Sequence, residues 1–355
     1  MLDLENLEHR ARERLSATMY DYFAGGADDE TTLADNPVAW KRIRLVPRVL
    51  RDASAVSTST VVLGTPMAMP IMAGPWAFQG LAHAGGEKAT AQGAAAAGVV
   101  MVVSTVATSS LEDVARAAGS PLWFQFYLLR DRGMTGDLLH RAEAAGYRVL
   151  VMTVDKLPVS GRRRRLAADR FSLPEGTPVP NFGYVVPEGH DAGPDGYLRG
   201  LLDASVTFAD LEWACAESRL PLVVKGILNP RDAVEAVEAG AAGVIVSNHG
   251  GRQLDGSIAT ADALPAVVDA VAGRVPVLVD GGIRSGADVV KALAIGASAV
   301  LVVRPVIWGL VVHGAPGVEA VLNELAAETA HAMALCGARS VADIDRSLVW
   351  GMAGA

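Results

Sequence analysis

The chain is poor in cysteine for its length. Cys215 and Cys336 are the only two among 355 residues, and they lie far apart in stretches with a helical pattern. Two cysteines are too few for a disulfide framework or for a cysteine-based metal site. We therefore expect no metal and no chemistry that depends on paired thiols.

Positive charge is also in the minority. The chain has 31 lysines and arginines against 39 aspartates and glutamates, which gives a formal net charge of −8. Proteins that bind nucleic acid through a basic surface need the opposite balance. The composition therefore predicts no nucleic-acid partner.

Long apolar runs are absent as well. No uncharged apolar run reaches the ~18 residues that a membrane span requires. The first seven residues, MLDLENL, have neither the basic region nor the apolar region of a signal peptide. We expect a cytoplasmic protein without a membrane partner, and a hydrophobic content of 51% allows it a large core.

The most informative stretch is VSNHGGRQLDG, residues 246–256, which directly follows an apolar run. His249 and Arg252 lie three positions apart, with glycines between them. Glycine permits a close approach of the backbone to a ligand. A histidine can hold or move a proton near neutral pH, and an arginine can bind a carboxylate through two parallel hydrogen bonds. The pattern favours a catalytic loop, and the alternative is a polar loop with a structural histidine.

From residue 70 onward, apolar runs alternate with alanine-rich amphipathic stretches that end in glycine. Near-continuous apolar runs are typical of parallel strands buried on both faces, and a glycine often follows the end of a helix. Eight such runs predict a (β/α)8 barrel over residues 70–355. An open, doubly wound sheet is the alternative, and the absence of G-x-G-x-x-G after the first run disfavours it. The runs are 70–73, 99–104, 122–127, 149–153, 222–224, 243–247, 275–279 and 299–303.

Two segments stand outside this alternation. Residues 1–69 are expected to form an extension with helices over 4–24 and up to about Trp40, as part of one domain covering 1–355. Residues 156–207 form a long insertion after the fourth strand, rich in proline, glycine and aspartate. Such loops are usually lids, binding loops or disordered segments. At least two of the four arginines at residues 162–165 are expected to form a solvated or phosphate-attracting patch.

Polar side chains follow most of the predicted strands. Active sites of (β/α)8 barrels lie at the carboxyl ends of the strands, so we expect these side chains to converge. The glycine-rich loop 280–286 after the seventh strand and Arg304 after the eighth predict a phosphate site. The whole set is Ser104, Gln125, Tyr127, Thr153, Asp155, Lys225, Ser247, His249, Arg252, Asp280, Arg284 and Arg304.

These motifs resemble the FMN-dependent α-hydroxy-acid oxidase and dehydrogenase family, which includes glycolate oxidase, lactate oxidase, mandelate dehydrogenase and hydroxymandelate oxidase. The resemblance covers nearly the whole chain and is densest at SNHGGRQLD, residues 247–255. Further matching motifs lie at residues 20–22, 47–50, 124–127, 153–155, 224–226 and 280–284.

The resemblance implies FMN as cofactor and an (S)-2-hydroxy acid as substrate. His249 would be the base, with Asp155 favouring its protonated form, and Lys225 would lie beside the flavin. Catalytic roles are implied for His249, Asp155, Tyr127, Arg252 and Tyr22. Substrate contacts are implied for Tyr22, Tyr127, Arg163, His249, Arg252, Trp76 and Val106. Cofactor contacts are implied for Pro75, Trp76, Ala77, Ser104, Gln125, Thr153, Lys225, Ser247, Asp280, Gly281, Gly282, Arg284, Val303 and Arg304.

The chain departs from the family's pattern at three places. Val303 stands where the family usually has glycine, which bears on how closely the backbone approaches the phosphate. One extra residue precedes Pro158, which bears on the alignment of Arg163. Trp76 stands where the family usually has a small or medium residue.

The resemblance predicts oxidation to the 2-oxo acid, with electrons passed to O2 to give H2O2, by a homotetramer. The alternatives are a dehydrogenase with another acceptor and a flavin-binding protein without turnover. An isopentenyl diphosphate isomerase of type 2 shares the barrel and FMN but would not need the pair of His249 and Arg252. Whether the base takes the hydroxyl proton or the α-proton stays open.

The variable part of the substrate is its 2-substituent. Val106 occupies the place where glycolate oxidase carries a tryptophan, and Leu129 is expected to add an apolar wall. Together they favour a larger apolar or aromatic substituent, as in mandelate. Trp76 would oppose this if its ring points into the site.

Overall fold

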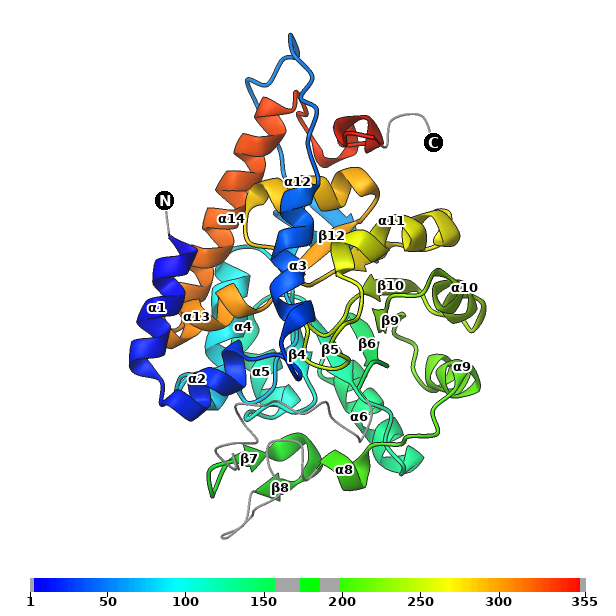
Figure 1. Cartoon of the computed structure of the whole chain (residues 1–355). Coiled ribbons are helices and arrows are strands. Elements are labelled where there is room, and N and C mark those ends of the chain that lie inside the picture. Colours follow the sequence, from blue (N-terminus) through cyan, green and yellow to red (C-terminus); the bar gives the residue numbers. More distant parts are fainter. Residues whose placement is uncertain (1–2, 157–172, 186–197, 352–355) are drawn as a thin grey trace.

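The computed structural model describes residues 3–156, 173–185 and 198–351 (Figure 1). Eight parallel strands close into a barrel, which confirms the predicted (β/α)8 fold and excludes the open sheet. Every predicted apolar run overlaps one barrel strand, and β9 continues past the predicted end at residue 224 to Ile227. The barrel strands are β3 (Ile71–Ala73), β4 (Met101–Ser104), β5 (Leu122–Phe126), β6 (Val149–Thr153), β9 (Leu222–Ile227), β10 (Gly243–Val246), β11 (Val277–Val279) and β12 (Ala299–Val302).

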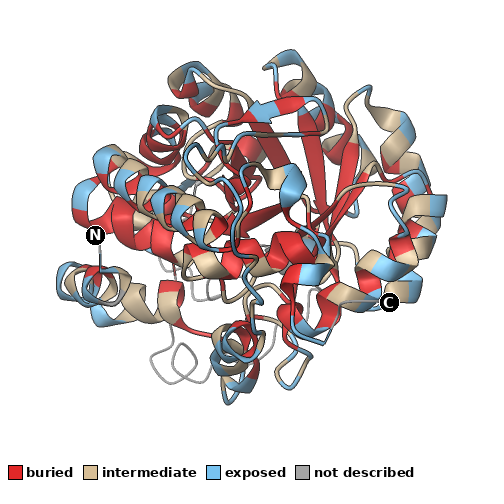
Figure 2. Ribbon diagram, turned by 90° about the horizontal axis from the view of Figure 1, so that it is seen from above, coloured by how far each residue is buried: buried red, intermediate tan, exposed pale blue. Residues whose placement is uncertain are grey.

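Helices surround the barrel and turn their exposed faces outward (Figure 2). The glycines expected to end helices, at 98, 119, 146, 240, 273 and 296, all have positive φ, as that role requires. The surrounding helices are α4 (Gly86–Ala96), α5 (Leu111–Ala118), α6 (Arg132–Ala144), α9 (Phe208–Glu217), α10 (Pro230–Glu238), α11 (Thr260–Val271), α12 (Gly286–Ile295), α13 (Arg304–His313) and α14 (Ala315–Leu335).

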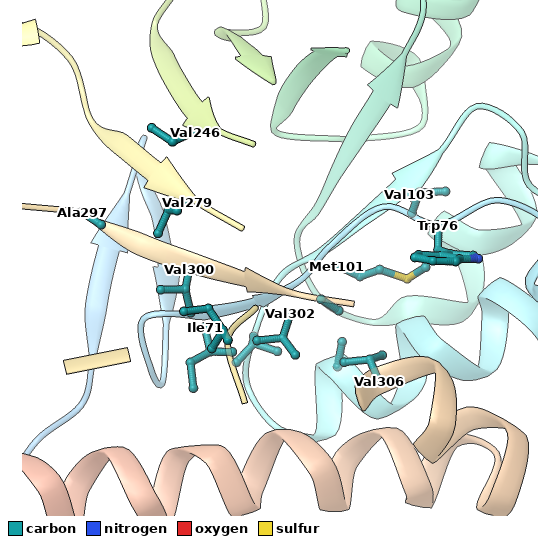
Figure 3. Close-up of a cluster of buried hydrophobic side chains, with 14 of the residues drawn as sticks. Ile71, Trp76, Met101, Val103, Val246, Val279, Ala297, Val300, Val302 and Val306 are labelled. Carbon is teal, nitrogen blue, oxygen red and sulfur yellow. The ribbon is translucent and has the colours of Figure 1, made fainter. Parts of the chain in front are cut away.

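The strands are apolar throughout because both of their faces are buried. Val102 and Val223 point into the barrel and belong to an inner cluster. Met101 and Val224, one position away, belong to the cluster between strands and helices. Figure 3 shows part of that outer layer, including Val300 of β12. Side chains along the strands thus point alternately into two apolar clusters. The polar residues lie at the strand ends, where they face the open end of the barrel.

The N-terminal extension forms helices where the sequence predicts them and packs along the barrel. Its elements are α1 (Leu4–Arg14), α2 (Ala17–Ala24), α3 (Thr31–Arg42), and a short hairpin of β1 (Thr60–Val62) and β2 (Thr65–Met67). α1 lies beside α13 (Figure 1), and the ring of Tyr20 stacks on that of Trp308 at 5.6 Å. α3 packs against α11 and α12 and so reaches the loops that follow β10 and β11.

The insertion after β6 is described in part. It contains β7 (Pro178–Val179), β8 (Tyr184–Val185) and α8 (Leu198–Leu201), which lie at the same end of the molecule as α2 (Figure 1). Asn181 ties this segment to the barrel, because its side chain accepts from Leu111 N and donates to Thr105 O. The arginine run 162–165 lies outside the described residues.

Membrane spans were expected to be absent. Within residues 3–156, 173–185 and 198–351, no helix combines the length and the hydropathy that crossing a bilayer requires.

Candidate active site

A cavity of about 930 Å³, measured out to its open mouth, lies at the carboxyl ends of the barrel strands. Ligand and cofactor sites of (β/α)8 barrels lie at this end of the barrel. The expected site residues in its wall are Tyr22, Pro75, Trp76, Ala77, Ser104, Val106, Gln125, Tyr127, Thr153, Lys225, His249, Arg252, Asp280, Gly281, Gly282, Arg284, Val303 and Arg304.

Two expected residues lie behind the wall, a third falls outside the described residues, and one prediction is wrong. Asp155 and Ser247 lie behind the wall, bonded to residues that form it. Arg163 lies outside the described residues. Leu129 was predicted to be an apolar wall of the substrate pocket, but it is fully buried away from the cavity, where its backbone pairs with that of Leu202.

The wall also contains residues that the sequence did not single out. Lys156 directly follows Asp155, so the strand-end argument could have included it. Phe78 has φ +57°, a conformation that bulky residues rarely adopt and that no local pattern reveals. The residues missed are Phe78, Lys156, Gly250, Ile283, Leu301 and Val302.

His249 and Asp155 form a hydrogen-bonded pair across the ends of β10 and β6. Nδ1 of His249 lies 2.9 Å from Oδ1 of Asp155. Burial lowers the pKa of His249, and the opposing effect of Asp155 does not outweigh it. Asp155 therefore acts in the expected direction, but the imidazole is neutral near pH 7. A neutral imidazole bound through Nδ1 presents Nε2 as a proton acceptor.

Asp155 stays ionised in this pair. Burial raises the pKa of its carboxyl, but attraction to His249 and Lys225 outweighs that effect and brings the pKa below its ordinary value. The attraction to His249 acts fully once the imidazole is protonated, whereas Lys225 carries its charge throughout. The carboxylate thus stabilises any positive charge that develops on His249.

The loop that carries His249 is held from the N-terminal extension. His249 itself has φ +57°, and its backbone N donates to Ser247 Oγ. A Cβ on Gly251 would lie 2.6 Å from the backbone N of Leu33 in α3, so only glycine fits there. The amides of Asn36 and Asn248 bond each other in both directions, at 3.0 and 2.8 Å.

Lys225 and Asp280 form a buried ion pair in the cavity wall. Nζ lies 2.9 Å from Oδ2, and each residue is 4% exposed. Burial lowers the pKa of Lys225, but attraction to Asp280 and Asp155 outweighs it, so the ammonium persists. The other oxygen of Asp280, Oδ1, is buried and accepts no hydrogen bond from the described residues. A buried acceptor of this kind calls for a ligand that donates.

Two arginines of the wall are anchored on the carboxyl end of α2. Nη1 of Arg252 donates to the carbonyls of Tyr22 and Gly25, both at 2.9 Å. Arg304 donates to the carbonyls of residues 24, 25 and 250. Carbonyl groups at the carboxyl end of a helix attract cations. The end of α2 therefore fixes the positions of both guanidinium groups in the cavity wall.

Arg284 lies in the glycine-rich loop after β11. Nη1 donates to the carbonyl of its neighbour Ile283. Burial lowers the pKa of the guanidinium, which Glu8 and Asp288 offset only in part. Because burial disfavours the charged form of Arg284, an anionic ligand would stabilise the guanidinium.

A family model described as FMN-dependent dehydrogenase matches residues 11–351. The chain belongs to this family. It is 48% identical to an L-lactate oxidase from Nostoc sp., over 98% of both chains. It is 44% identical to human 2-hydroxyacid oxidase 1, over 98% of this chain and 96% of that protein. A solved structure of mandelate oxidase with (S)-4-hydroxymandelic acid has a TM-score of 0.90 at 42% identity, over 96% of this chain and 97% of the other.

The cavity fits FMN, the cofactor of the FMN-dependent dehydrogenase family. Asp280 Oδ1 would accept a hydrogen bond from a ribityl hydroxyl. Arg284, Arg304 and the amino end of α13 would provide donors and positive charge for the phosphate. Gln125 and Thr153, bonded to each other at 3.0 Å, would provide polar contacts for the ring system.

Val303, which stands where the resemblance led us to expect glycine, is accommodated by its neighbour. A Cβ on Gly74 would lie 2.6 Å from Cγ2 of Val303. The missing side chain on Gly74 therefore provides the room that Val303 takes, and the valine remains in the cavity wall.

Proposed function

We propose that the protein oxidises an (S)-2-hydroxy acid to the 2-oxo acid and passes the electrons to O2, giving H2O2. The observation that carries this proposal is that His249, bonded to Asp155 behind it, lines one cavity together with Arg252 and two tyrosines. The names of its relatives, an L-lactate oxidase and a 2-hydroxyacid oxidase, support the same reaction class. FMN, when bound, accepts the two electrons that the substrate loses.

In this proposal, Arg252 binds the substrate carboxylate through two parallel hydrogen bonds. The hydroxyl groups of Tyr22 and Tyr127, both of which line the cavity, orient the substrate. Nε2 of His249 then accepts a proton, and Asp155 stabilises the imidazolium that forms. Lys225 would hold a buried positive charge beside the ring system of the cofactor, which gains negative charge on reduction.

We further propose that the substrate carries a larger apolar or aromatic 2-substituent, as mandelate does. Val106 lines the cavity with a small side chain. The indole of Trp76 lies in the wall as well, but it is packed over the guanidinium of Arg252. The indole therefore fills space where the substrate carboxylate would bind. The space beside Val106 remains for the 2-substituent. The mandelate oxidase structures similar to this chain support this preference.

Purified protein is expected to be yellow and to release FMN on denaturation, because the Asp280 and arginine contacts match that cofactor. Anaerobic mixing with glycolate, lactate and mandelate should bleach the flavin absorbance, fastest with mandelate. Reoxidation in air within the turnover time would support the oxidase. Slow reoxidation with fast reduction would instead indicate a dehydrogenase with another acceptor, and recovery of FAD would contradict the cofactor assignment.

We also propose a cytoplasmic homotetramer. Two free cysteines suit a reducing compartment. Residues 45–50 run beside residues 336–350, and apolar side chains exposed on these two segments offer a surface for a second copy. The most exposed of them are Val49, Leu50 and Trp350, at 77%, 101% and 76%.

Replacing Leu50 and Trp350 with aspartate should lower the molecular mass in solution. The reason is that a charge placed on an apolar interface cannot be buried without a large desolvation cost. Light scattering after size-exclusion chromatography measures the mass. A wild-type monomer, or a tetramer that survives both substitutions unchanged, would contradict the proposal.

A further inference from the structure

Trp76 places a large aromatic ring in the cavity wall. It follows Pro75 in the loop after β3, and only 9% of its surface is exposed. It is also where this chain departs from the small or medium residue that the family pattern leads one to expect. A large aromatic ring placed inside a binding cavity needs a reason, because it removes volume that a ligand could use.

Two cations face this ring. The guanidinium carbon of Arg252 lies 4.3 Å from the ring centroid of Trp76, and that of Arg304 lies 5.7 Å from it. Cations within about 6 Å of an aromatic face are attracted to it, most strongly when water is excluded. Arg252 is 5% exposed, so its contact with the ring is largely desolvated.

The indole nitrogen does not explain the tryptophan. Nε1 of Trp76 is buried and has no hydrogen-bond partner among the described residues. A structural tryptophan buried for its N–H would normally have an acceptor. Like Oδ1 of Asp280, this N–H is left for a ligand in the cavity, so the contacts of Trp76 with the two arginines are made by the faces of its ring.

The aromatic rings add to the backbone contacts of Arg252. Nη1 donates to the carbonyls of Tyr22 and Gly25, which holds the guanidinium beside the end of α2. The same guanidinium lies over the rings of Trp76 and Tyr22, with its carbon 4.3 and 5.4 Å from their centroids. The two rings therefore limit the positions that the group can take in the cavity.

We infer that Trp76 is a positioning residue for substrate recognition: its ring holds the guanidinium of Arg252 in the plane that binds the substrate carboxylate. Two-pronged binding of a carboxylate requires the guanidinium and carboxylate to be nearly coplanar. Fixing the plane in advance removes an ordering cost from binding. This inference rests on the proposed role of Arg252 as the carboxylate-binding residue.

The test compares Trp76→Phe with Trp76→Leu in the FMN-loaded enzyme. Phenylalanine keeps an aromatic face and loses no hydrogen bond to the described residues, whereas leucine removes the face. Dissociation constants are measured by flavin absorbance for phenylglyoxylate and for its neutral amide, with pyruvate and pyruvamide as a second pair. Trp76→Met replaces the leucine variant if that variant does not retain FMN.

Trp76→Leu is expected to weaken binding of the carboxylate about 2- to 30-fold, the range of a cation–π contact between exposed and desolvated sites. The amide, which carries no charge for Arg252 to bind in two-pronged fashion, should change less than the carboxylate, and Trp76→Phe should resemble the wild type. Equal weakening of carboxylate and amide would overturn the inference, because it would indicate a general loss of structure.

Arg252→Met separates this inference from the proposal on which it rests. If Arg252→Met leaves carboxylate binding unchanged, the proposed role of Arg252 is wrong. If it weakens binding, the effect of Trp76→Leu should shrink when both substitutions are combined, because the two residues act through one contact. Effects that simply add would overturn the role of Trp76 and leave that of Arg252 intact.

Discussion

Replacing His249 with alanine is expected to slow reduction of the bound cofactor by substrate about 100- to 10,000-fold, the usual cost of losing a general base. FMN should remain bound, because the ion pair of Lys225 and Asp280 and the two arginines after β11 and β12 are untouched. Anaerobic stopped-flow measurement of flavin bleaching gives the rate, and the flavin spectrum before mixing reports loading. A rate within a few-fold of the wild type would place the base elsewhere.

Asp155→Asn is the matched control for this prediction. Asparagine can keep the contact with Nδ1 of His249 but removes the charge that stabilises the imidazolium. We expect a smaller loss than in His249→Ala, since the proton acceptor itself is still present. A loss as large as that of His249→Ala would mean that the charge of Asp155, and not the basicity of the imidazole, limits the reaction.

The electrostatics of the His249–Asp155 pair also predict how the rate of reduction depends on pH. Burial lowers the pKa of His249 below its ordinary value of 6.5, and Asp155 opposes that shift. A base works only when deprotonated, so the rate of reduction should hold as pH falls through 6.5 and decline only below it. In Asp155→Asn the opposing effect is lost, so the decline should move to still lower pH. A shift in the other direction would contradict the electrostatic account of the pair.

The sequence predicted the barrel and most of the cavity wall for one physical reason. Strands buried on both faces must be apolar, so a polar residue at a strand end stands out, as Gln125 and Lys225 do. In β9 this signal also misled, because the strand continues through Lys225 and Gly226 to Ile227. The apolar run ends where the site begins, not where the strand ends.

Other features left no local signal. Gly226 has φ +116°, and a Cβ there would lie 2.7 Å from the side chain of Asp155, a contact between β9 and the end of β6. Gly251 is required by Leu33, more than two hundred residues earlier in the chain. Leu129 was misplaced because the chain leaves the barrel after β5, where the alternation of side chains no longer applies.

We propose that the cavity near Val106 selects the substrate, and the backbone of Val106 is well fixed. Val106 N donates to Ser104 Oγ at 3.1 Å, and its carbonyl accepts from Phe78 N at 3.0 Å. The residue is 1% exposed and lines the cavity. With its backbone held at both ends, a larger side chain at this position has to take volume from the cavity or from its packed neighbours.

Val106→Trp is therefore expected to lower kcat/KM for mandelate about 10- to 200-fold, in the range by which a filled pocket discriminates between substituents. Glycolate, which has no substituent to exclude, should lose much less, because Arg252 still binds its carboxylate. Steady-state kinetics with both acids measure the ratio, and Val106→Ala, which enlarges the cavity, should keep mandelate as a substrate. If both acids lose activity equally, the tryptophan has distorted the site instead of filling the substituent pocket. If glycolate already has the highest kcat/KM in the wild type, the pocket is not open at Val106, and Trp76 closes it.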